Sequence, residues 1–135
     1  MEILLDASAI MAVIIEEPEK EQVINITKNV TIVSPSMVPF EIANGLSKMT
    51  KRKIIDKNRM VNAFEFFNRI PIKIIETDIK KALEIAGDYN IYAYDAFYLE
   101  SAKRLGLPLL TFDGNMARIG KEICLTILGG KDAGV

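Results

Sequence analysis

The stretch Glu2-Ile3-Leu4-Leu5-Asp6 decides how the fold is interpreted, because a continuous aliphatic run stops abruptly at an acid. A short run without polar alternation is typical of a strand that is buried on both faces, as in parallel sheets. Four similar runs follow along the chain, and segments with apolar residues at helical spacing lie between them. This alternation predicts an α/β fold: a three-layer α/β/α domain with a five-stranded, mostly parallel sheet.

The boundaries of these segments follow from breaks in the apolar pattern. Ser8 and Thr77 are expected to cap the helices that follow them, and Gly106 is expected to end another. The predicted strands cover residues 2–5, 30–33, 72–75, 108–112 and 124–128. The predicted helices cover residues 9–16, 18–28, 36–52, 56–69, 78–89, 94–105 and 113–121.

The length of 135 residues predicts one domain, which we assign to residues 1–128, and we expect residues 129–135 to be a disordered tail. The net charge of −1 gives the molecule as a whole no attraction to nucleic acids or acidic membranes.

No apolar run reaches the ~18 residues of a membrane-spanning helix. The start of the chain lacks the basic region of a signal peptide. The single cysteine, Cys124, is interpreted as a buried residue of the last strand and fits a reducing compartment. These features predict a cytoplasmic protein.

Four acids occupy the places where apolar runs stop, and the chain contains no histidine. Asp6 and Asp113 follow predicted strands, whereas Glu41 and Asp95 lie near the starts of predicted helices. Strand ends and helix starts gather at one edge of such a sheet, so the four acids could converge there. Two carboxylates 4 Å apart repel by about 4 kcal/mol at an effective dielectric of 20, so a cluster of four is unfavourable unless a cation neutralises them or some of them stay protonated. Oxygen ligands without imidazole suit Mg²⁺ or Mn²⁺.

Each acid also has a simpler interpretation when it is taken alone. Asp6 and Asp113 could only cap the helices that follow them, and Glu41 could be a solvated helix residue. Asp95 is harder to explain in this way, because apolar residues surround it in the sequence and an ionised carboxylate there needs a partner.

A basic cluster stands out against the balanced charge of the rest of the chain. It is either a solvated helix end that complements the helix dipole or a contact surface for RNA. Its members are Lys48, Lys51, Arg52 and Lys53.

Four segments together resemble the ordered motifs of PIN-domain ribonucleases, and the single-domain size resembles the VapC-type toxins of that family. The resemblance extends from residue 2 to about residue 128. The segments are Leu-Leu-Asp-Ala-Ser-Ala at 4–9, Pro-Phe-Glu-Ile-Ala-Asn-Gly-Leu at 39–46, Tyr-Asp-Ala-Phe-Tyr-Leu at 94–99 and Leu-Leu-Thr-Phe-Asp-Gly-Asn at 109–115.

The resemblance implies a metal-dependent endoribonuclease of a type II toxin–antitoxin pair, with a five-stranded parallel sheet. It implies an RNA substrate such as tRNA or rRNA, a small VapB-like antitoxin that inserts a segment into the active groove, and a homodimer. Asp6, Glu41, Asp95 and Asp113 would hold Mg²⁺ or Mn²⁺ and form the catalytic quartet. Hydrogen bonds that support the acids are expected from Ser8, Asn44 and Thr111.

Several alternatives stay open at this level. The same residues suit an RNA-processing nuclease outside a toxin–antitoxin pair, or an inactive PIN-fold protein that only binds. A phosphoacceptor receiver domain fits less well, because Ala7 stands where the second acid of its pair is required. Tyr94 and Tyr98 beside Asp95 are either core packing or a surface on which a flipped base stacks.

Overall fold

The structure is a computed structural model, and it describes residues 1–130. Its five strands form one sheet in the order β3-β2-β1-β4-β5, and every neighbouring pair is parallel. This confirms the predicted α/β class and shows that the sheet is parallel throughout. The strands are β1 (Glu2–Leu5), β2 (Thr31–Pro35), β3 (Ile72–Ile75), β4 (Leu109–Leu110) and β5 (Ile127–Leu128).

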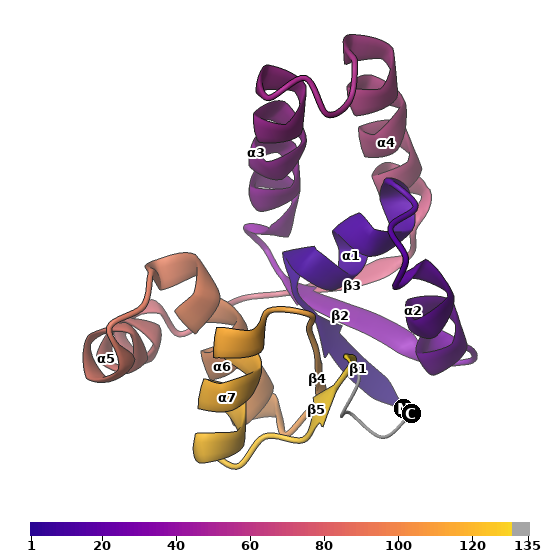
Figure 1. Cartoon of the computed structure of the whole chain (residues 1–135). Coiled ribbons are helices and arrows are strands. Elements are labelled where there is room, and N and C mark those ends of the chain that lie inside the picture. The colour runs from indigo at the N-terminus through magenta and orange to yellow at the C-terminus, as the bar shows by residue number, and fades with distance from the viewer. Residues whose placement is uncertain (131–135) are drawn as a thin grey trace.

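Helices connect all the strands, as parallel pairing requires. Figure 1 shows α1 to α4 gathered on one side of the molecule and α5 to α7 on the other. The helices are α1 (Ala7–Ile14), α2 (Lys20–Thr27), α3 (Val38–Lys51), α4 (Lys57–Arg69), α5 (Ile79–Tyr89), α6 (Ala93–Leu105) and α7 (Gly114–Glu122).

The strand order explains this division of the helices. From β1, strands β2 and β3 extend the sheet in one direction, and β4 and β5 extend it in the opposite direction. Because crossover connections between parallel strands are right-handed, the two directions place their helices on opposite faces of the sheet. The order reverses between β1 and β4, and a crevice for ligands forms at such a reversal.

The core is densest around the middle of the sheet. Leu4, Leu109 and Leu110 are fully buried, and Ile3 and Leu5 are only 2% exposed. Each such side chain contributes about 1.5–3 kcal/mol relative to an exposed position. The uninterrupted aliphatic run at the start of the chain therefore encodes the central strand.

Two predicted helix caps are wrong. Asp6, and not Ser8, caps α1, because the Asp6 carboxylate accepts a hydrogen bond from the Ala9 N–H at 3.1 Å. Asp78 caps α5, and the neighbouring Thr77 hydroxyl instead pairs with the Ser101 hydroxyl. The predicted end of α6 is confirmed, since Gly106 adopts a left-handed conformation there.

The buried, strand-bound position predicted for Cys124 is also wrong. Cys124 is exposed and has a φ of +69°, in the turn that ends α7. Its N–H donates to the Lys121 carbonyl, and the next N–H, of Leu125, donates to the Gly120 carbonyl. These bonds occupy the backbone that an early start of β5 would need, so β5 begins only at Ile127.

The chain after β5 runs close to the end of β4. Gly129 has a φ of +95°, and a Cβ atom there would lie 2.7 Å from the Thr111 carbonyl oxygen. The Gly130 carbonyl accepts a hydrogen bond from the Gln22 side chain at 3.1 Å. The rest of the predicted tail, residues 131–135, lies outside the described residues. In the part of the chain that is described, no helix is long and apolar enough to cross a membrane.

Candidate acidic site at the carboxyl edge of the sheet

The four acids come from four different chain segments that meet near the strand-order reversal. Asp6 directly follows β1, and its N–H donates to the Leu110 carbonyl at the end of β4. Glu41 and Asp95 lie in the first turns of α3 and α6, and Asp113 is the N-cap residue of α7. In Figure 1, β1 and β2 lead to the same edge of the sheet, where α1 and α3 begin.

Asp6 is the most enclosed of the four acids, with 2% of its surface exposed. One carboxylate oxygen accepts from the Ser8 hydroxyl at 2.6 Å and from the Ala9 N–H at 3.1 Å. The other oxygen accepts from the Thr111 hydroxyl at 2.5 Å. These neutral donors fix the orientation of the carboxylate but do not neutralise its charge.

Ser8 and Thr111 also bind the backbone beyond β4. The Ser8 hydroxyl accepts from the Phe112 N–H, and the Thr111 hydroxyl accepts from the Asp113 N–H, each at 3.0 Å. Each hydroxyl therefore donates to Asp6 and accepts from a backbone N–H just beyond β4. This pair of bridges ties the ends of β1 and β4 together and sets where Asp113 begins α7.

Glu41 has a partner that the sequence did not reveal. The hydroxyl of Tyr98 donates to the Glu41 carboxylate at 2.5 Å, and the Tyr98 ring is 1% exposed. Tyr98 is therefore packed in the core while its hydroxyl reaches the site, whereas Tyr94 is 43% exposed. The available signal was the spacing of Asp95 and Tyr98, which are three residues apart and so share one face of α6.

Three of the four acids have a raised pKa, to which the charge of another of the four contributes. Burial raises the pKa of Asp6 from its ordinary value of 3.8 to about 6, and the Glu41 charge adds to the rise. Burial also raises the pKa of Glu41, with further contributions from the charges of Asp95 and Asp113. The pKa of Asp95 is raised by burial first and then by the Asp113 charge. Each acid thus acts on at least one of the others.

The protein itself supplies little positive charge against this cluster. Within residues 1–130, none of the four acids takes part in an ion pair. Among the described residues, Lys48 is the basic residue whose charge lowers the pKa of Glu41. One buried carboxylate (Asp6), two half-buried ones (Glu41 and Asp95) and an exposed one (Asp113), none of them in an ion pair among the described residues, form a strongly anionic site.

The donor set fits a hard divalent cation, because all four groups offer carboxylate oxygens. In their present orientations, no three of the acids described stand close enough to ligate one ion directly. Mg²⁺ usually retains several waters and binds through one or two carboxylates, so it does not require direct contact with all four.

The remaining predicted residues lie at varying distances from this cluster. Asn44 is exposed one turn beyond Glu41 on α3, and no hydrogen bond joins its side chain to the acids described here. Lys48 and Lys51 are in the last turn of α3, with Arg52 at its end, and they and Lys53 are exposed. At 1.5 Å per residue, Lys51 and Arg52 lie roughly 15–17 Å along the helix axis from Glu41, and Lys53 lies beyond the helix end, so only Lys48 is close to the acids.

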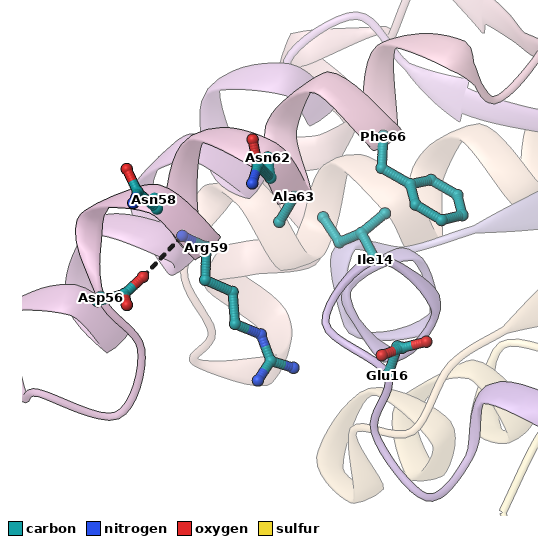
Figure 2. Close-up of a pocket in the computed structure, with 8 residues that line it drawn as sticks. All are labelled: Ile14, Glu16, Asp56, Asn58, Arg59, Asn62, Ala63 and Phe66. Carbon is teal, nitrogen blue, oxygen red and sulfur yellow. Dashed lines mark hydrogen bonds between the residues drawn. The ribbon is translucent and has the colours of Figure 1, made fainter.

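A cavity of about 470 Å³ lies elsewhere, between the end of α1 and one face of α4. Figure 2 shows Ala63 and Phe66 of α4 beside Ile14 at the end of α1. None of the four acids lines this cavity. It is therefore separate from the acidic site.

Comparisons with known proteins agree with this architecture. The family model described as PIN domain matches residues 3–122, and the chain belongs to the PIN-domain family. Ribonuclease VapC3 of Pyrobaculum aerophilum is 28% identical over 122 residues, which cover 87% of this chain and 93% of that protein.

Two solved structures show the same fold. The crystal structure of PAE2754 from Pyrobaculum aerophilum matches with a TM-score of 0.68 and 24% identity, over 87% of this chain and 78% of that one. The crystal structure of VapBC2 from Rickettsia felis bound to a DNA fragment from their promoter matches with a TM-score of 0.64 and 21% identity. That match covers 94% of this chain and 97% of the other.

Proposed function

We propose that this protein is an Mg²⁺- or Mn²⁺-dependent endoribonuclease and the toxin of a type II toxin–antitoxin pair. The observation that carries the proposal is the acidic site itself. Four carboxylates from separate segments gather at the strand-order reversal, where the charge of a neighbouring acid adds to the raised pKa of Asp6, of Glu41 and of Asp95. The described protein offers the four acids no ion-pair partner. Membership of the PIN-domain family and similarity to Ribonuclease VapC3 support the same activity.

The residues around the acids prepare the site before any ligand binds. Ser8 and Thr111 hold both oxygens of Asp6 in place, and Tyr98 holds one oxygen of Glu41. Asp95 and Asp113 complete the anionic cluster from the starts of α6 and α7. An RNA phosphodiester is itself anionic, so these ionised groups repel it until their charge is compensated.

A bound divalent cation would supply that compensation, together with a more acidic water for attack on the phosphorus. Asp6, Glu41, Asp95 and Asp113 are the residues that would hold it. The chain has no histidine, so an imidazole pair cannot perform the acid–base chemistry instead.

The partners follow from the same proposal. The substrate is RNA, and the inhibitor is a small VapB-like antitoxin. Structures of the fold neighbours include VapBC2 from Rickettsia felis, a toxin–antitoxin complex from Klebsiella pneumoniae and FitAcB from Neisseria gonorrhoeae, which support an antitoxin partner. We further propose a homodimer and cytoplasmic action.

A cleavage assay with labelled tRNA tests the activity. We expect cleavage with Mn²⁺ or Mg²⁺ and none with EDTA. Asp95→Asn and Asp6→Asn should each lower the rate by at least about a hundredfold, because each removes several kcal/mol of charge stabilisation. Asp88→Asn, at an exposed acid on α5, is the matched control and should keep the full rate.

The assay also separates the alternatives. Wild-type rates in both Asp6→Asn and Asp95→Asn would overturn the assignment of the site. Binding of Mn²⁺ in titration calorimetry without cleavage of any RNA would indicate an inactive PIN-fold binding protein.

A further inference from the structure

The exposed aromatic side chains are concentrated beside the acidic site. Ten aromatic residues occur in the chain, and four of them are exposed. Three of these four lie within three positions of Glu41 or Asp95, and the fourth, Phe66, is on α4. Exposed apolar rings gain nothing from core packing, so their clustering points to a ligand.

Phe40 and Tyr92 are the least covered of these rings, at 71% and 87% exposed. Phe40 directly precedes Glu41 in the first turn of α3, and Tyr92 is the N-cap residue of α6, three positions before Asp95. Tyr94 differs from them because its ring leans on Phe97, with ring centres 5.9 Å apart. Tyr94 is therefore already engaged in intramolecular packing.

The two helix starts that carry these rings lie next to each other. The hydrogen bond from Tyr98 to Glu41 joins α6 to α3 directly, at 2.5 Å. Successive residues of a helix are about 100° apart around its axis, so Phe40 projects to one side of Glu41 and not into the acids. Phe40 and Tyr92 thus flank the acidic site from two different helices.

We propose that Phe40 and Tyr92 stack on unpaired bases on either side of the phosphodiester that is cleaved. The inference rests on the proposed ribonuclease function and narrows its substrate to single-stranded or looped RNA. Bases of a duplex are stacked on one another and cannot offer their faces to these rings, whereas unpaired bases can. Because every base has an aromatic face, the two rings select unpaired RNA without dictating its sequence.

Binding measurements with uncleaved RNA test this inference apart from catalysis. The probe is a fluorescein-labelled single-stranded RNA of eight nucleotides, measured by anisotropy with Asp95→Asn protein and Mg²⁺. We expect Phe40→Ala and Tyr92→Ala each to weaken binding about tenfold. Phe40→Tyr should retain wild-type affinity, because it keeps the ring.

Phe66→Ala is the matched control, since it removes an exposed aromatic ring that lines the separate cavity between α1 and α4 (Figure 2). It should leave RNA binding unchanged. The salt dependence gives a second readout, because loss of a stacking ring lowers affinity without changing the slope of log K against log salt concentration. A shallower slope would instead indicate lost phosphate contacts and would count against stacking.

A tryptophan probe reports the contact directly. The chain contains no tryptophan, so Phe40→Trp introduces a single fluorophore at the proposed contact. Its emission should be quenched by the single-stranded RNA and unchanged by a blunt duplex of the same sequence. Equal binding by Phe40→Ala, Tyr92→Ala and the parent protein would overturn the inference even if the wild type cleaves RNA. Ring-dependent binding by a wild type that cleaves nothing would overturn the ribonuclease proposal alone.

Discussion

Asp6 and Glu100 are both almost completely buried, at 2% and 3% exposed, but their surroundings are opposite in kind. Glu100 on α6 forms an ion pair with Arg104 at 3.0 Å and accepts the Asp78 N–H at 2.9 Å. Arg104 also donates to the Glu76 carbonyl, so the pair fastens α6 to the segment between β3 and α5. Asp6 has only neutral donors and feels the like charge of Glu41.

The difference separates a buried charge that is compensated within the protein from one that is not. A buried carboxylate with a cationic partner is complete within the protein, and removing it breaks the fold locally. A buried carboxylate without such a partner raises the free energy of the metal-free protein and is retained for another reason. Burial alone therefore does not identify a site, whereas burial without charge compensation does.

Neutral substitutions of Glu100 and Asp6 should change the free energy of unfolding of the metal-free protein in opposite directions. Glu100→Gln should lower the free energy of unfolding by about 1–3 kcal/mol, because Arg104 loses its partner; the loss is moderated because the Arg104 side chain is 39% exposed. Asp6→Asn should raise it at pH 7.5 by up to about 3 kcal/mol, since a pKa of about 6 instead of 3.8 penalises the charged form. Urea unfolding in EDTA measures both.

Glu84→Gln provides the baseline, because Glu84 is an exposed acid on α5. Its free energy of unfolding should stay within about 0.5 kcal/mol of the wild type. A loss of stability in both Glu100→Gln and Asp6→Asn would remove the distinction between the two charges.

The pH dependence sharpens the same comparison. Asp6 binds its proton more tightly in the folded protein, where its pKa is about 6, than in the unfolded chain, where it is 3.8. Its stabilising protonation is thus fully present below pH 4 and is lost as the pH rises through 6. The stability advantage of Asp6→Asn should therefore be largest at pH 7.5 and vanish near pH 4. Urea midpoints at five pH values in EDTA check this, and an advantage that persists at pH 4 contradicts it.

The smallest expected effect concerns the tyrosine behind Glu41. The hydrogen bond from the Tyr98 hydroxyl lowers the pKa of Glu41, so Tyr98→Phe should raise that pKa further. Loss of this hydrogen bond should also lower the free energy of unfolding by about 0.5–1.5 kcal/mol. The Mn²⁺ concentration for half-maximal cleavage should rise several-fold, with little change in the rate at saturating Mn²⁺. Tyr89→Phe, at a half-buried ring on α5, is the control. An unchanged Mn²⁺ requirement would mean that the hydroxyl is not needed to position Glu41.

Local patterns in the sequence were sufficient for the sheet and for the positions of the four acids. Aliphatic runs mark strands buried on both faces, and the acids mark where those runs end, so their placement at one edge follows from parallel topology. The sequence did not reveal hydrogen bonds between distant segments. Examples are the bond from Tyr98 to Glu41 and the bond from the Asp78 N–H, at the start of α5, to Glu100. Which way each carboxylate points also depends on such partners, and their role in metal binding is a proposal.

The errors arose where backbone geometry overrode side-chain character. Cys124 sits in an apolar stretch that resembles a strand, but the chain there completes the turn after α7 with a positive φ. Ser8 precedes apolar residues like a cap, yet its hydroxyl donates to Asp6, which does the capping. Hydrophobic pattern could not distinguish these cases, because both depend on which hydrogen bond forms.

The close passage of Gly129 past Thr111 links a late position of the chain to its opening motif. Any side chain at position 129 would clash with the Thr111 carbonyl oxygen, and the Thr111 hydroxyl donates a hydrogen bond to Asp6. In a survey of all single substitutions, position 129 should be as intolerant of change as the four acids, although it carries no functional group. The mutational footprint of the acidic site thus reaches almost to the end of the described chain.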